Sequence, residues 1–508
     1  MTGHAQTDSG IAWLVPISAC LINAILFGVY RSYGIVLTAI IKEYSVSRSE
    51  ATWFISLCMT VIHLTGPVSG LLNNYFNAKA ITFFGCALAS IGVGLCYFAS
   101  SVLHIVICVG IIQGFGIGLT FVQIPAIVNQ YFVKFRASAN GLAMSGGTIG
   151  AFVFCPLTSY CLRHFKLDEL FLILASITLF SIPISLFFKP MKTEKNAEKE
   201  KIAKALKTSP VYLISFEREG LKLTENFRSH QKSEIIVKTH NTAMMPIRVT
   251  ADGITKTTSE IALYMERKLS CTNAMEVIKK ISNSAARSQM RQNFDKVIEI
   301  IENPYFVLIC LTHLAYFWGS LTYIMVIVDH AEDRGIANDV AAQLITTYSG
   351  GDLVGRLGSG WFVDRNVIPI KYLGMISVAF IGLVLKAVPF MSNFNILTIA
   401  SLALGFLSGT FVVLLNILFC KYLGTNDTPL ALGLSSFFCG LTTLVRPIVV
   451  GYYRDAINGS YDGLFNSLSV AALFTAVLWF FEPIIKRKAK LDKCNNDKAK
   501  QGTVVNKV

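Results

Sequence analysis

The residues in this sequence that could do chemistry are two opposite charges inside an apolar segment. Asp352 and Arg356 lie within the apolar run from about 340 to 363. They are four residues apart, so they share one face of a helix. An ionised side chain near the centre of a bilayer costs about 2.5–3.5 kcal/mol, and a chain that keeps two of them turns them toward each other or toward a ligand. We interpret this segment as the centre of a solute pathway; the alternative is a buried ion pair that only holds two helices together.

The chemistry of this pair suits an organic anion. A guanidinium holds a carboxylate through two parallel charge-assisted hydrogen bonds. Arg356 is therefore predicted to bind solute, with Asp352 as its counter-ion or as a proton carrier. Two more arginines within apolar segments, Arg31 and Arg446, are predicted to draw the anion. For each of these two, the alternative is a side chain that extends along the helix to the membrane surface.

Other kinds of site have no support in the sequence. No nucleophile–base set, nucleotide-binding loop or spacing of metal ligands is visible, so we predict no catalytic residues, no metal and no cofactor. Most of the 12 cysteines lie in apolar segments, where they behave as small hydrophobic residues. The net charge of +14 sits in loops and tail without a nucleic-acid-binding motif, so we predict no nucleic-acid partner.

The elements that must position the charges are membrane-spanning helices. The chain is 53% hydrophobic and only 15% charged, whereas soluble domains carry about 25% charged residues. Apolar runs of spanning length fall at about 11–41, 51–72, 80–100, 102–129, 137–160, 169–188, 304–328, 339–363, 371–390, 394–420, 428–450 and 461–484. These runs predict an all-α polytopic membrane protein with twelve transmembrane helices in two six-helix halves.

The two halves carry a matching turn. Gly70 precedes Asn74 by four residues after the second span, and Gly360 precedes Asp364 by four residues after the eighth, with a cation following each time. Such a turn lets an amide or acidic side chain cap a helix end at the cytoplasmic face. Its recurrence at matching places indicates the major facilitator architecture.

Four parts follow from this organisation. They are an N-terminal six-helix half at 1–188, a cytoplasmic central loop at 189–303, a C-terminal six-helix half at 304–485 and a basic cytoplasmic tail at 486–508. The segment 189–302 holds 21 Lys and Arg against 14 Asp and Glu, and the tail holds 8 against 2. Because positive loops stay in the cytoplasm, both termini are predicted there, with the plasma membrane as the default location. The last turns of the central loop are predicted to be helical, and its middle to be linker.

Two stretches carry a resemblance to a known family. One is Asp8-Ser-Gly-Ile-Ala-Trp13 before the first span, and the other runs from Tyr131 to Gly146 at the start of the fifth. Together with Asp352 and Arg356, they resemble the signatures of the monocarboxylate transporter family. The resemblance implies a major facilitator fold, alternating access and, in many members, proton-coupled transport of lactate-like anions. It also implies a single-span glycoprotein partner that helps the protein reach the cell surface.

One departure from that family leaves the mechanism open. Its proton-coupled members carry a lysine in the first span, and no lysine lies between Trp13 and Ile41 here. Arg31 could substitute as an anion contact, but a guanidinium does not lose its proton in proteins. We therefore expect a secondary transporter of a monocarboxylate, with or without proton coupling. The alternatives are a facilitator of neutral or zwitterionic solutes such as aromatic amino acids, and a membrane sensor or scaffold that transports nothing.

Overall fold

The structure of the 508-residue chain is a computed structural model. The residues that it describes are 8–188, 291–454 and 460–484, together with the backbone of four strands between 213 and 248. The predicted tail at 486–508 and most of the predicted central loop at 189–303 lie outside the described residues.

The N-terminal half is built from helices that follow the predicted spans. Its helical elements are η2 (Gly10–Trp13), α1 (Leu14–Tyr44), α2 (Arg48–Leu64), α3 (Gly66–Leu72), α4 (Ala78–Leu95), η3 (Cys96–Phe98), α5 (Val102–Ile105), the π-helical η4 (Val106–Gln113), α6 (Gly114–Tyr131), α7 (Arg136–His164), α8 (Leu167–Leu179) and α9 (Ser181–Ser185). α2 and α3 form one span that is interrupted at Thr65, two residues before Pro67, because a proline ring does not fit inside a regular helix.

The C-terminal half repeats this arrangement. Its elements are α13 (Pro304–Asp333), α14 (Asn338–Ala341), α15 (Gln343–Asp364), α16 (Ile370–Ala387), η6 (Val388–Phe390), α17 (Phe394–Leu423), α18 (Thr428–Gly451), α19 (Asp462–Leu478) and η8 (Trp479–Phe481). A further helix at 291–302 precedes α13, as predicted for the end of the central loop.

Eleven of the described helices are long and apolar enough to cross a membrane by length and composition. The twelfth expected span is α15, which is helical over 22 residues. Its glycines, its hydroxyl side chains and its two central charges lower its mean hydropathy, so composition alone does not mark it as a span. It nevertheless packs closely on α7 and α17. The predicted arrangement of twelve helical spans in two halves is confirmed for the described helices.

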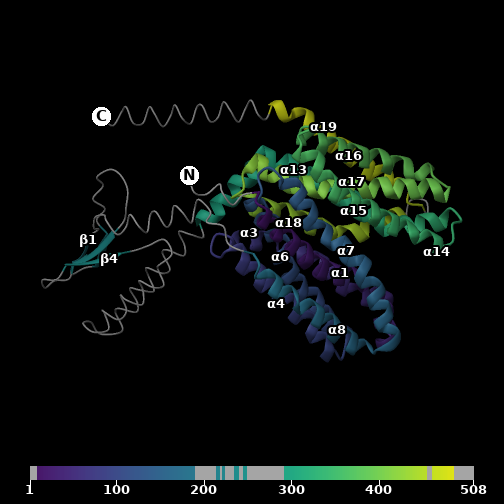
Figure 1. The fold of residues 1–508 in the computed structure, drawn as a ribbon, viewed down its shortest axis with the longest axis horizontal. Helices are drawn as coiled ribbons and strands as arrows, with labels where there is room; N and C mark the ends of the chain where they lie inside the picture. The colour runs from purple at the N-terminus through teal and green to yellow at the C-terminus, as the bar shows by residue number, and fades with distance from the viewer. Residues whose placement is uncertain are drawn as a thin grey trace. The chain divides into compact units, whose positions relative to one another are not determined.

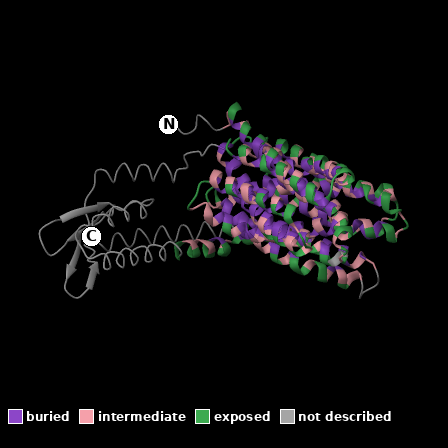
Figure 2. Ribbon diagram, turned by 90° about the horizontal axis from the view of Figure 1, so that it is seen from below, coloured by how far each residue is buried: buried purple, intermediate pink, exposed green. Residues whose placement is uncertain are grey.

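The distribution of apolar side chains suits a lipid environment. Buried residues gather between the helices, and exposed residues lie on the outside of the bundle (Figure 2). Large apolar side chains stand on those outer faces: Phe84 is 63% exposed, Phe180 is 66% exposed and Val470 is 63% exposed. Scattered along many helices, such residues would meet water in a soluble protein, whereas here they face the position of the lipid chains.

Small residues set the close contacts inside each half. In the N-terminal half α1 packs most extensively on α7, and in the C-terminal half α15 packs most extensively on α17 (Figure 1). A side chain on Gly405 would strike the backbone carbonyl of Tyr348, and one on Gly409 would strike that of Asp352. These two glycines therefore let α17 approach the turn of α15 that carries the charged pair.

The two halves meet along two pairs of helices. α7 packs on α15, and α18 packs on α2 and α3. On the first seam a Cβ at Gly360 would lie 2.5 Å from the Cα of Ser138, and on the second a Cβ at Gly70 would lie 2.6 Å from the Cα of Leu430. Both contacts lie at the end of the bundle where α7 and α18 begin. The halves are thus closed against each other at that end.

A separate unit contains a small sheet. Contacts divide the chain into one unit of residues 1–190 and 299–508 and another of residues 191–298. The second unit holds strands β1 (Leu213–Glu217), β2 (Gly220–Leu223), β3 (Glu234–Lys238) and β4 (Met244–Arg248), in the order β2-β1-β3-β4 with only β1 and β3 parallel. The sequence analysis did not predict these strands, because strands of four or five residues leave too little periodicity to be seen in a sequence.

Candidate functional site

Asp352 and Arg356 form an ion pair inside the bundle. The Nε of Arg356 lies 2.9 Å from Oδ2 of Asp352, one helical turn apart on α15. This N–H is not aligned for a hydrogen bond to the carboxylate, so the contact is electrostatic. Both side chains turn away from lipid, because an ionised group that faced the lipid chains would be costly in free energy.

The pair is held by the other half of the molecule. Thr148 of α7 donates a hydrogen bond of 2.6 Å from its hydroxyl to Oδ2 of Asp352. Arg356 donates from Nη1 to the backbone carbonyl of Met144, also on α7, over 2.8 Å. Met144 and Thr148 are four residues apart, so one face of α7 receives both charges. The pair therefore joins the two halves to each other.

The exposed fractions of the two side chains show that the seam is closed around the pair in this conformation. Asp352 is 3% exposed, and the side chain of Arg356 is 13% exposed. The carboxylate thus lies within the closed seam between α7 and α15 and does not face an open passage. The inward orientation of the pair agrees with the expectation, and its role in a solute pathway stays a prediction.

A second contact closes the same seam. The carboxylate of Asp364, at the end of α15, accepts hydrogen bonds from the backbone N–H groups of Ala137 and Ser138, each of 2.8 Å. These N–H groups are in the first turn of α7, where a helix has unpaired donors and a partial positive charge. The predicted helix cap is confirmed for Asp364, and the helix that it caps belongs to the opposite half.

The other two predicted arginines do not join the pair. Within the described residues, Arg31 and Arg446 form no ion pair or hydrogen bond with Asp352 or Arg356. Arg31 is exposed on α1, and Arg446 is half-buried on α18. The charge of Arg31 acts on the hydroxyl of Tyr316, as do the charges of Asp352 and Arg356. The structure brings Asp352 and Arg356 into contact and does not bring the other two arginines into contact with them.

The two signature stretches contact each other directly. The carboxylate of Asp8 accepts hydrogen bonds from the backbone N–H groups of Val133, Lys134 and Phe135, in the loop before α7. The ring of Trp13 packs edge-on against that of Phe132, with centroids 5.0 Å apart. Sequence reasoning did not predict these contacts, although the acidic residue five positions before Trp13 was visible.

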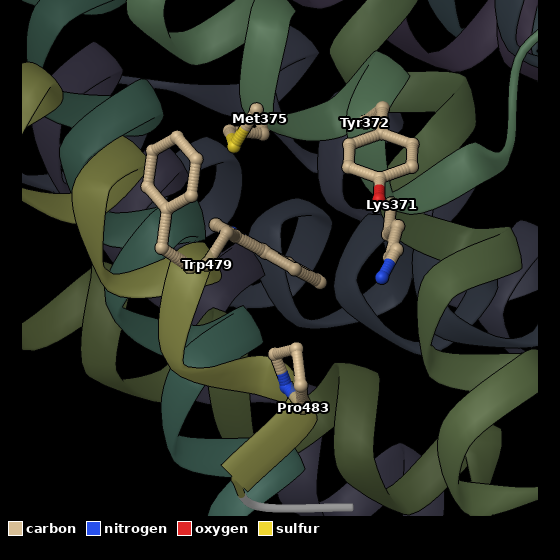
Figure 3. Close-up of a pocket in the computed structure, with 6 residues that line it drawn as sticks. Lys371, Tyr372, Met375, Trp479 and Pro483 are labelled. Carbon is tan, nitrogen blue, oxygen red and sulfur yellow. The ribbon is translucent and has the colours of Figure 1, made fainter.

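A pocket elsewhere in the C-terminal half is not part of this site. Its lining residues are Lys371, Tyr372, Met375, Trp479, Phe480 and Pro483 (Figure 3). Lys371 pairs with Glu482 over 3.2 Å, and the indole of Trp479 donates to Thr312 over 3.0 Å. The lining comes from the start of α16 and the segment directly after α19, so it lies within one half, whereas Asp352 and Arg356 join two. Among the described residues, no group of acidic, histidine or cysteine side chains could hold a metal ion.

Comparison with known proteins agrees with this architecture. The sequence model of the Major Facilitator Superfamily matches residues 19–234 and 307–503. Monocarboxylate transporter 12 of Rattus norvegicus is 24% identical over 491 residues, which are 94% of this chain and 87% of the relative. Monocarboxylate transporter 9 of Mus musculus is 23% identical over 459 residues, which are 90% of this chain and 89% of that relative.

Solved structures show the same fold. The transporter FucP, crystallised in the outward conformation, aligns with a TM-score of 0.59 and 13% identity over 93% of this chain and 99% of its own. The proton:xylose symporter XylE aligns with a TM-score of 0.59 and 11% identity over 94% of each chain. At these identities the likeness concerns the fold alone. This chain is therefore a multi-pass membrane transporter rather than an enzyme, it belongs to the Major Facilitator Superfamily, and it is a divergent relative of the monocarboxylate transporters.

Proposed function

We propose that this secondary transporter moves a small organic anion, a monocarboxylate, across the plasma membrane by alternating access. The observation that carries the proposal is the buried pair of Asp352 and Arg356, which α7 of the opposite half holds through Thr148 and Met144. A guanidinium placed on the seam between the halves is where an anion can influence whether the seam opens. The names of the relatives support the same class of solute.

The contacts suggest how binding and movement are linked. With α7 beginning at the cytoplasmic face, as predicted, the seam closes the cytoplasmic side. A solute carboxylate that reaches Arg356 competes with Asp352 for the guanidinium, since both are planar anions. Loss of that pairing, or a proton on Asp352, weakens the bonds to α7 and lets the halves rock apart. Arg31 and Arg446 draw the anion toward the pair through their charges.

The test is uptake by the purified chain in sealed vesicles. Labelled lactate, pyruvate and benzoate are offered beside labelled phenylalanine as the zwitterion, at two external pH values. We expect saturable uptake of at least one of the carboxylates, above that of vesicles without protein. Uptake of phenylalanine alone would favour the alternative of a zwitterion facilitator, and uptake of none of them would overturn the proposal.

A further inference from the structure

One buried histidine has no hydrogen-bond partner on either ring nitrogen. His63, on α2, is 4% exposed, and neither Nδ1 nor Nε2 is paired in the described structure. A buried polar atom without a partner destabilises the fold unless something else compensates for it. A neutral imidazole has one donor and one acceptor, and both are unused here. By contrast His313, on α13, has its Nδ1 2.7 Å from the hydroxyl of Ser435.

His63 lies where the two halves meet. Its ring is 4.8 Å from that of Phe317 on α13, and a Cβ at Gly440 of α18 would lie 2.9 Å from the Cβ of His63. Both neighbours belong to the opposite half. The guanidinium of Arg446 is close enough for its charge to act on the imidazole. The unpaired nitrogens therefore lie at a contact between the two halves, which alternating access would break and remake.

Aromatic rings surround this position. His63 packs edge-on against Phe121, with centroids 5.9 Å apart, and Phe121 packs in the same way on Phe27. On the other side of the seam, Phe317 packs on His313 at 6.2 Å. A few polar atoms among aromatic rings are typical of a site for a flat organic ligand. Arg446 supplies the positive charge nearby, which leaves the imidazole for an uncharged group.

We propose that His63 binds the transported solute directly, through a hydrogen bond to a hydroxyl group on a flat, aromatic body. The substrate class is accordingly an aromatic monocarboxylate that carries a hydroxyl group, with its ring among Phe27, Phe121 and Phe317. This inference rests on the proposed function, because it assigns the carboxylate of the same solute to the arginines.

The experiment compares labelled 4-hydroxybenzoate with labelled benzoate in vesicles, with uptake by protein-free vesicles subtracted. We expect the wild type to prefer the hydroxylated acid at least fivefold in kcat/KM. His63→Phe should reduce this ratio to about one, and His63→Gln, which keeps a donor and an acceptor, should retain part of it. The matched control is His330→Phe. His330 is also buried, has an unpaired Nε2 and packs edge-on against Phe465, but its partner ring is in its own half.

A stability measurement accompanies the transport assay. Since the imidazole has no partner to lose, His63→Phe should melt at the same temperature as the wild type or higher, and 4-hydroxybenzoate should raise the melting temperature of the wild type only. Any of three results would overturn the inference. They are a lower melting temperature in His63→Phe, an unchanged preference of that variant for 4-hydroxybenzoate over benzoate, and an equal loss of this preference in His330→Phe. Uptake of lactate with neither benzoate transported would overturn it and leave the proposed function standing. If no carboxylate is transported, the proposed function fails. The rise in the melting temperature of the wild type with 4-hydroxybenzoate then decides alone whether this ligand binds at His63.

Discussion

The nitrogens of Arg356 have separate tasks, which makes this residue hard to replace. Nε faces the carboxylate of Asp352, while Nη1 donates to the carbonyl of Met144 on the opposite half. A lysine has a single ammonium group on a flexible chain and cannot reach both partners with fixed geometry. The charge at this position is thus less important than the shape of the group that carries it.

Replacement of Arg356 by lysine should lower carboxylate uptake at least tenfold. A charge-assisted hydrogen bond is worth about 1.5–3 kcal/mol, so the loss of one corresponds to roughly a tenfold to hundredfold fall in kcat/KM. Initial rates of uptake in vesicles measure it. Arg163→Lys, at the exposed end of α7, is the control and should behave as the wild type. Uptake by Arg356→Lys at the wild-type rate would remove the guanidinium from the binding site.

Asp352 is the residue on which proton coupling is predicted to depend. Asparagine keeps the size of the side chain and cannot exchange a proton. In Asp352→Asn, an acidic outer solution should no longer stimulate uptake, whereas the wild type should respond to it. Because the change also leaves Arg356 buried without its counter-ion, we expect lower stability, by about 3–5 kcal/mol for a broken buried pair. A variant that folds and still responds to the pH gradient would place the coupling elsewhere.

The spacing of Asp352 and Arg356 was enough to predict their pairing, and the sequence could not reveal what holds them. The i, i+4 relation is a property of one helix, so the contact within α15 follows from it. Thr148 lies 204 residues away from Asp352, and their hydrogen bond depends on how two halves pack. A hydroxyl inside a span usually bonds to its own helix, which gave Thr148 no distinguishing signal.

At the scale of elements, α7 and α15 form the seam that must open. Asp364 joins the end of α15 to the beginning of α7, and the ion pair joins them again about three turns further along. Glycines let the two helices touch between these points, since a side chain on Gly141 would strike the carbonyl of Arg356. The seam is therefore tied at two places and closely packed between them.

Loss of the cap at Asp364 should shift the molecule toward the form that is open at this end. Asp364→Asn weakens two charge-assisted hydrogen bonds to backbone N–H groups of α7. It also removes the attraction between the carboxylate and the helix N-terminus, which is worth up to about 1 kcal/mol. Spin labels at the start of α7 and the end of α15 should report a larger population of long distances. Asp339→Asn, on an exposed acidic residue of α14, is the control. An unchanged distribution of distances would show that the packing alone closes the seam.

The spans were predicted within a few residues because lipid and water impose a sharp contrast in side-chain polarity on the chain. α7, for example, occupies 136–164 where 137–160 was expected. α15 shows the limit of hydropathy alone. Its glycines and charges are the features that make it central to the site, and the same features lower its mean hydropathy. The sequence analysis still marked it as a span, because apolar residues surround the charges over a spanning length.

At the scale of the whole molecule, every contact of the site lies in the unit of residues 1–190 and 299–508. The ion pair, the cap at Asp364 and the neighbours of His63 all come from its helices. We therefore expect transport to depend on this unit, whereas a membrane sensor would signal through its central segment.

A chain in which residues 200–295 are replaced should therefore still transport. A Gly- and Ser-rich linker of about 40 residues has a root-mean-square span of roughly 35 Å and keeps the halves in one chain. We expect uptake within about twofold of the wild type per molecule of protein at the surface, since the seam and its charges are unchanged. The same replacement in the Arg356→Lys background should keep the low uptake of that variant, which controls for leakage. The contrary outcome is a full loss of uptake in a replacement that folds correctly and keeps its melting temperature. The helices alone would then be insufficient to move the solute, so the central segment would take part in the transport cycle.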